Sequence, residues 1–114
     1  MDAKLDIFDN RRWHDGVLLS MQAISNVDRI DFILTVALYD DETSHRRKSI
    51  IIEFHNINHV TLNMNTEEIL DNAGAGNIKE LMYATHGAKS TFSLLLFGGC
   101  LKFSFDDFII KTSI

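Results

Sequence analysis

Hydrophobic and polar residues alternate along most of this chain with a period of two, the pattern of β-strands that bury one face. The clearest run is 30–39 (IDFILTVALY), where one face would carry Ile30, Phe32, Leu34, Val36 and Leu38. Further strands, separated by short polar links, are predicted over 17–24, 50–54, 60–64, 78–85, 92–97, 100–105 and 108–114. Short links favour antiparallel pairing of neighbouring strands.

One short helix is predicted near 66–73. Asn65 can cap it, and Glu68 stands three residues further on, as in a capping box. The glycine-rich step 73–76 would end it after about two turns. The chain is therefore predicted to be a mainly β (β-rich α+β) domain over 1–114, with seven to eight mostly antiparallel strands. We expect a sandwich or a strongly curved, barrel-like sheet.

The segment 92–105 (FSLLLFGGCLKFSF) predicts a β-hairpin. If Gly98-Gly99 forms the two-residue turn, the opposed pairs are Leu96 with Leu101, Leu94 with Phe103, and Phe92 with Phe105. Directly opposed residues share a face, so one face of the hairpin would be entirely apolar.

Composition and charge narrow the classes of protein that the chain can belong to. Its 114 residues suffice for one domain with a core of its own. No apolar run approaches the length of a membrane span, the first residues do not form a secretory signal, and the single Cys100 cannot form an internal disulfide. We therefore expect a cytoplasmic protein.

The net charge of −5 argues against a nucleic-acid binder, whose affinity depends on clustered lysine and arginine. The basic cluster 45–48 directly follows the acidic run 40–42, which cancels it locally. An acidic chain would instead suit a basic partner.

Candidates for metal or catalytic chemistry are few. Metal phosphohydrolases place a doublet such as His14-Asp15 on a helix, beside ligands from other helices, and this chain predicts almost no helix. His55 and His59 have the spacing of a helical ligand pair, but an extended chain separates such rings by up to about 13 Å. A metal needs three or four convergent ligands, so we expect no metal, no cofactor and no catalytic set. An alternative remains open, a metal-dependent enzyme that uses these four residues.

The doublet has two other interpretations. Asp15 can accept backbone N–H bonds in a turn, with Gly16 easing the start of the following strand and Trp13 lying over the open end of the core. Alternatively, the doublet lies on an exposed rim and contacts a partner.

Trp13-His14-Asp15, followed by the strand-like residues 17–20 (VLLS), resembles the start of the bacterial polymorphic-toxin immunity family called immunity protein 50. The similarity continues in 50–54 (IIIEF), 60–64 (VTLNM) and 76–78 (GNI). The Trp-Pro step that the family has before the doublet is absent, since this chain contains no proline. The resemblance implies a non-enzymatic cytoplasmic protein that blocks a toxin.

We therefore expect a small, non-enzymatic binding protein whose partner is another protein, with a basic toxin domain as the candidate, and which binds neither nucleic acid nor membrane. The expected partner contacts are Trp13, His14 and Asp15, with a steering patch formed by Asp40, Asp41 and Glu42. A different class is a self-associating structural module, in which the terminal strand 108–114 would pair two copies into a homodimer.

Overall fold

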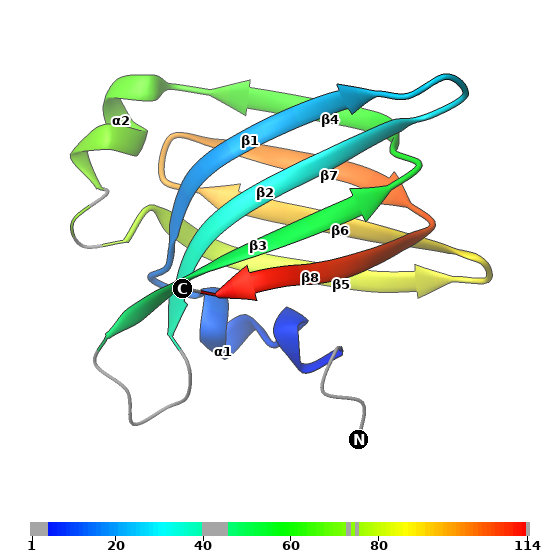
Figure 1. The fold of residues 1–114 in the computed structure, drawn as a ribbon. Coiled ribbons are helices and arrows are strands. Elements are labelled where there is room, and N and C mark those ends of the chain that lie inside the picture. The colour runs from blue at the N-terminus through cyan, green and yellow to red at the C-terminus, as the bar shows by residue number, and fades with distance from the viewer. Residues whose placement is uncertain (1–4, 40–45, 73, 75, 114) are drawn as a thin grey trace.

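The chain folds into two four-stranded antiparallel sheets that pack face to face (Figure 1). The computed structural model describes residues 5–39, 46–72, 74 and 76–113. One sheet has the strand order β1-β2-β3-β8 and the other β4-β7-β6-β5. The elements are η1 (Leu5–Phe8), α1 (Asn10–Trp13), β1 (Val17–Ser25), β2 (Ile30–Tyr39), β3 (Arg47–His55), β4 (Asn58–Met64), α2 (Thr66–Asp71), β5 (Ile78–His86), β6 (Lys89–Leu96), β7 (Gly99–Phe105) and β8 (Asp107–Ser113). The predicted mainly β class is confirmed, and the form is the sandwich.

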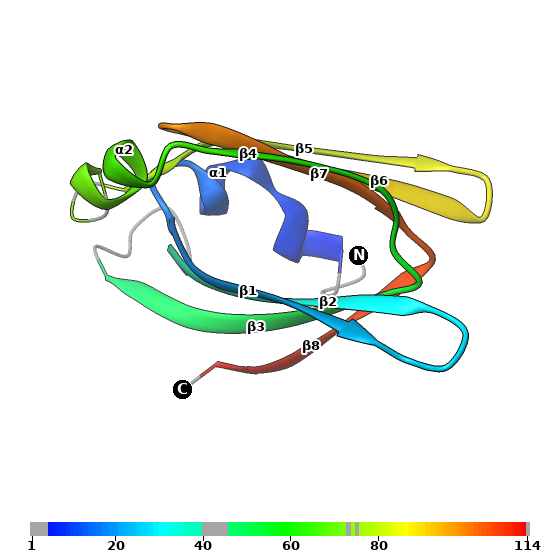
Figure 2. The same cartoon turned by 90° about the horizontal axis from the view of Figure 1, so that it is seen from above.

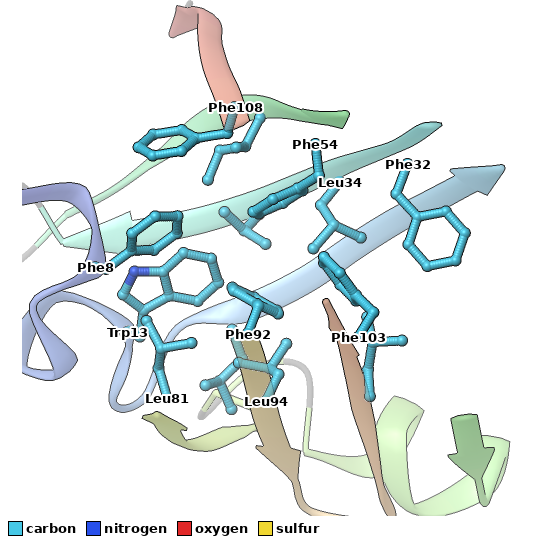
Figure 3. Packing of buried hydrophobic residues seen from close by; sticks show 14 of the residues in the cluster. Phe8, Trp13, Phe32, Leu34, Phe54, Leu81, Phe92, Leu94, Phe103 and Phe108 are labelled. Carbon is cyan, nitrogen blue, oxygen red and sulfur yellow. The ribbon is translucent and has the colours of Figure 1, made fainter. Parts of the chain in front are cut away.

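The core lies between the two sheets, which form two layers when seen from above (Figure 2). The predicted inward face of 30–39 is buried from Phe32 onward, whereas Ile30, at the first position of β2, is exposed. Aromatic rings join the layers: Phe54 of β3 lies 5.1 Å from Phe92 and 5.0 Å from Phe103, centroid to centroid (Figure 3). Each such buried ring contributes about 1.5–3 kcal/mol through its removal from water.

The N-terminal segment closes one side of the sandwich, beside the edge strands β5 and β8. The ring of Phe8 lies 4.5 Å from that of Tyr83 on β5 and 4.8 Å from that of Phe108 on β8. Trp13 follows it into the core and is fully buried, and its indole N–H donates to the carbonyl of Ile7. The short helices η1 and α1 thus fill the space between two sheet edges (Figures 1 and 2).

The β6–β7 hairpin forms, but its predicted register is wrong by two positions. The observed pairs are Leu96 with Gly99, Leu94 with Leu101, and Phe92 with Phe103. The turn consists of Phe97 and Gly98, with φ at +106° for Gly98. A Cβ on Gly99 would overlap the carbonyl oxygen of Asn63, so a glycine is needed here for the close approach of β4 to β7. A displacement of two keeps the parity of each strand, and the apolar face is therefore as predicted.

Helix α2 begins as predicted. The side chain of Asn65 accepts a hydrogen bond from the backbone N–H of Glu68 at 3.2 Å, which satisfies one of the free donors of the first turn. The helix ends at Asp71, and residue 73 of the predicted range lies outside the described residues. Within the described part of the chain, the helices are too short to cross a membrane.

Candidate functional site

The His14-Asp15 doublet lies on the surface, in the loop between α1 and β1. The side chains of His14 and Asp15 are 60% and 53% exposed, and His14 Nε2 lies 3.6 Å from a carboxylate oxygen of Asp15. His14 Nδ1 is 2.8 Å from the carbonyl oxygen of Lys79. The backbone N–H of Asp15 donates to the carbonyl of Ile78, with φ at +66° for Asp15. The doublet therefore lies in the turn that joins α1 to β1, and Asp15 takes part in this turn through its backbone N–H.

Arg47, the first residue of β3, forms hydrogen bonds with this loop and with the loop after α2. Its Nε donates to the carbonyl of Asp15 at 3.0 Å and its Nη1 to the carbonyl of Gly74 at 3.3 Å. Its guanidinium carbon lies 5.4 Å from the ring centroid of Tyr39. A Cβ on Gly76 would overlap the carbonyl oxygen of Asp15, so the two loops contact each other through their backbones. The loop is a backbone junction that leaves two polar side chains on the surface.

The predicted partner contacts have different outcomes. The prediction that Trp13 contacts a partner is wrong, because its ring is fully buried among the core aromatics. His14 and Asp15 are exposed side by side and remain available to a partner. The acidic residues 40–42 lie outside the described residues.

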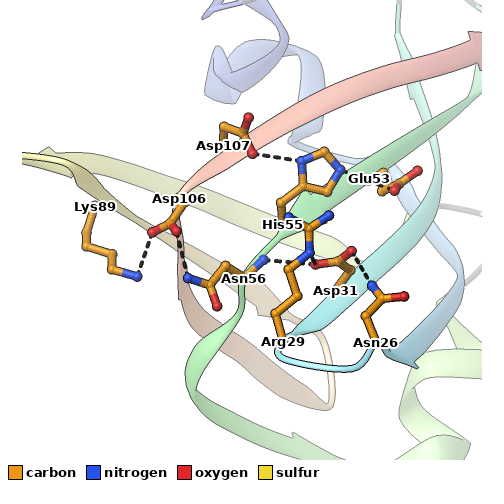
Figure 4. Close-up of polar contacts among 9 residues, drawn as sticks. All are labelled: Asn26, Arg29, Asp31, Glu53, His55, Asn56, Lys89, Asp106 and Asp107. Carbon is orange, nitrogen blue, oxygen red and sulfur yellow. Dashed lines mark hydrogen bonds and ion pairs between the residues drawn. The ribbon is translucent and has the colours of Figure 1, made fainter.

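A polar cluster lies at the opposite end of the sandwich and was not predicted (Figure 4). It combines Asp31 of β2 with Glu53 and His55 of β3, and one possible ligand atom from each lies within 4.8 Å of the others. Because β2 and β3 pair with Ile33 opposite Glu53, the strand register brings these residues together. Three such groups at this distance are the starting point of a metal centre, so their other partners decide what the cluster can do.

Asp31 is buried, and both of its carboxylate oxygens already have donors. Oδ1 accepts from the backbone N–H of Asn56 at 2.9 Å and lies 3.1 Å from Nε of Arg29. Oδ2 accepts from the side-chain amide of Asn26 at 2.9 Å. Asp31 therefore holds the β1–β2 turn against the β3–β4 turn, at the place where a metal would need its lone pairs.

His55 lies between two carboxylates. Its Nδ1 is 2.7 Å from an oxygen of Asp107 and its Nε2 is 3.2 Å from Oε1 of Glu53. A carboxylate only accepts hydrogen bonds, so a ring nitrogen of His55 that carries a proton donates to the carboxylate beside it. Oε2 of Glu53 is shielded from solvent and makes no hydrogen bond of regular geometry, but the ammonium of Lys111 lies 2.8 Å away and neutralises it.

The pKa values of two acids follow from these contacts. The pKa of Glu53 lies below its usual value, chiefly because Lys111 stabilises the charged form, with His55 adding to the effect. The pKa of Asp106 is also lowered, first by a hydrogen bond from the side-chain amide of Asn56 and then by Lys89.

The cluster therefore belongs to a wider ion-pair network, and its donors fit a metal ion poorly. The acids of this network are Asp31, Glu53, Asp106 and Asp107, with Arg29, Lys89 and Lys111 as cations and His55 between two of the acids. An added cation would have to displace ammonium and guanidinium groups that already occupy the carboxylates.

The four residues of the metal-enzyme alternative do not form one site. Asp15 contacts Arg47 at the start of β3, and His55 ends that strand. Eight residue steps of strand separate the two points by about 26 Å. His14 lies with Asp15, and His59 is exposed at a bulge of β4 in the other sheet, with φ at +54°.

The edge strands β1 and β4, with α2 at one end, form a surface that we call the open edge (Figures 1 and 2). Leu62 of β4 pairs with the buried Leu101, so it faces the inside of the sandwich. Val60, Leu62 and Met64 are nevertheless 47%, 45% and 38% exposed. The described segments therefore leave the apolar side chains of this strand, including the inward-facing Leu62 and Met64, partly uncovered.

A cavity of about 400 Å³ lies at the α2 end of the open edge, a size within the range of binding sites for small ligands. Its walls come from both edge strands and from the helix, and they are mainly apolar. They include Leu18, Met21, Met64, Ile69 and Leu70.

Charge distinguishes the open edge from the opposite side of the sandwich, where the N-terminal segment lies beside β5 and β8. β5 carries Lys79 and Glu80, and β8 carries Asp107 and Lys111, whereas β1 and β4 contain no aspartate, glutamate, lysine or arginine. Edge strands usually carry charges or proline that prevent them from pairing with another chain. The open edge therefore lacks the usual protection at a place where inward-facing apolar side chains are partly exposed.

Comparisons with protein-family models, with curated proteins and with solved structures found no match.

Proposed function

We propose that this chain is a small, non-enzymatic binding protein that engages another protein through the open edge. The observation that carries the proposal is the set of inward-facing apolar residues of β4, which stay more than a third exposed on a strand without charged side chains. Apolar side chains that gather on an exposed surface mark interaction sites in proteins.

The polar groups of the chain support a binding role over catalysis. The Asp31–Glu53–His55 cluster has its lone pairs and protons committed to internal partners. The His14-Asp15 pair is exposed and lies at the other end of β3. Catalysis by acid, base or nucleophile needs several such groups converging on one substrate, whereas the groups of the cluster contact each other and the His14-Asp15 pair stands apart from them.

The class of partner comes from charge and from the resemblance noted above. A net charge of −5 favours a basic partner, and the similarity to immunity proteins suggests a toxin that is neutralised by occlusion. The proposed site of action is the cytoplasm, where the single cysteine, Cys100, would remain reduced.

Co-expression with a toxin encoded beside this gene tests the proposal. We expect the chain to restore growth and Leu62→Glu to abolish the rescue, because it places a charge on the open edge. Met82→Glu is the matched control, since Met82 is an exposed apolar residue on the outer face of the other edge strand, β5. Rescue that Leu62→Glu leaves intact, or a gene neighbourhood without a toxin, would contradict the proposal.

A further inference from the structure

We infer that the partner binds as an extended segment that adds to β4 as the next strand of its sheet. Its alternate apolar side chains would face β1, and a basic residue would lie beside α2. The inference rests on the proposed function, and it specifies the chemistry of the partner segment.

The backbone of β4 is available for such pairing. β4 is an edge strand that pairs with β7 on one side, and all seven of its residues are exposed. An edge strand presents unpaired N–H and C=O groups on its outer side, and an extended peptide satisfies them by main-chain hydrogen bonds. β4 also has neither proline nor a charged side chain that would disfavour a neighbour.

The positions of the bulges favour β4 over β1 as the strand that accepts the partner. In β4 the irregularity lies between Asn58 and Thr61, at the start of the strand, and pairing is regular from Thr61 to Met64. In β1 the irregularity falls between Leu18 and Ser20, beside the cavity. A bulge disrupts the ladder and bends the strand, so the regular end of β4 is the better template.

The side chains of β4 set the pattern expected in the partner. Leu62 and Met64 pair with Leu101 and Gly99, face inward and are partly exposed, and Val60 beside them is exposed as well. Side chains at alternate positions of an added strand would lie next to them, above the cavity walls that Leu18 and Met21 provide from β1. The partner segment is therefore apolar at every second position.

The charge at the end of the open edge selects against a second copy of this chain. α2 follows β4 directly and carries Glu67, Glu68 and Asp71, with no basic residue among 66–71. These carboxylates would attract a lysine or arginine at the end of the added strand. A second copy of β4 or β1 would bring no such cation, because neither strand contains one.

A synthetic peptide of alternating valine and threonine with two lysines at one end is a suitable probe. Fluorescence anisotropy measures its binding to the full chain. Two further versions of the peptide are N-methylated on alternate amides, so that in each version one edge of the extended peptide loses its N–H donors. We expect the version methylated on the edge that faces β4 to bind about tenfold more weakly, because its main-chain donors are lost. The version methylated on the outer edge should bind nearly as the parent does, and replacing the lysines by glutamates should weaken binding.

Hydrogen exchange provides the second measurement, since strand addition should slow exchange of the amides of 60–64 when the peptide is present. Equal binding by the two methylated versions, no binding by the parent peptide, or protection of 60–64 by dimer formation without peptide would overturn the inference. A different result, growth rescue that Leu62→Glu leaves intact, would contradict the proposed function itself. Rescue lost by that variant, with no peptide binding, would refute strand addition alone.

Discussion

Replacing Trp13 by alanine distinguishes a core role for this residue from a role as a partner contact. Its ring is fully buried, lies 5.5 Å from Phe92 and 6.4 Å from Phe8, centroid to centroid, and donates to the carbonyl of Ile7. Truncation would leave a cavity where the N-terminal segment fills the sandwich. Changes of this kind cost about 3–5 kcal/mol, whereas substitutions on the surface cost about 0.5 kcal/mol or less.

That loss is large compared with the total stability of a small domain, about 5–15 kcal/mol. With a urea dependence of about 2 kcal/mol per molar, the unfolding midpoint should fall by about 2 M. Far-UV circular dichroism is the appropriate signal, because Trp13 is the only tryptophan and its fluorescence disappears with the substitution.

The neighbouring His14→Ala is the control, since its side chain is mostly exposed and its ring contacts, among the described residues, the backbone carbonyl of Lys79 and the exposed carboxylate of Asp15. It should lower the free energy of unfolding by less than about 1 kcal/mol. If Trp13→Ala destabilised the chain no more than His14→Ala, the position of the N-terminal segment between the sheets would be refuted.

Three further predictions concern the ion-pair network and the loops. Because the pKa of Glu53 is lowered on folding, its stabilisation is complete above the unfolded value near 4.5 and is lost as the pH falls through the folded value. Glu53→Gln should therefore lower the free energy of unfolding by about 1 kcal/mol at pH 7, and the variant should lose less stability than the parent as the pH falls below 4.5. Urea titrations in which the two chains lose stability equally at acidic pH would contradict this. Gly76→Ala forces a Cβ against the carbonyl of Asp15 at a φ of +113°, and should lower the melting temperature by about 8 °C or more, whereas Gly74→Ala, with open space around it, should not. Zinc at several equivalents should leave the melting temperature unchanged, and stoichiometric uptake lost on mutation of His55 would show that the network opens for a metal.

The strands were the part of the fold that local sequence could predict. The alternation in 30–39 coincides with β2, and Asn65 caps α2 as its position before two glutamates suggested. Both signals depend on neighbouring residues only, so they survive without knowledge of the topology. The predicted hairpin register was wrong because Gly99 is required for close contact with Asn63 of β4, a strand outside the hairpin, and not for the turn.

The N-terminal helices and the ion-pair network could not be predicted in the same way. η1 and α1 have four residues each, too few to leave a periodic pattern, and the insertion of Phe8 and Trp13 stabilises them through tertiary contacts. Asp31 and Glu53 meet through strand register, and Asp106 joins them from a corner 53 positions beyond Glu53. Only the uncharged edge strands left a signal that sequence reading could have used, the lack of ionisable residues other than His59 in 17–25 and 58–64.

The strand order of the first sheet has a consequence for how the chain reaches its native state. Ile52 of β3 pairs with Ile110 of β8, 58 positions further along, after the chain has built the whole of the other sheet. Such distant pairing slows folding of all-β domains to about milliseconds to seconds, since a long loop must close first. Until β8 arrives, the isoleucine run 50–52 is an unprotected edge that can associate with other molecules. The yield of renaturation should therefore fall as protein concentration rises, and strengthening the β3–β8 pairing should reduce aggregation during expression.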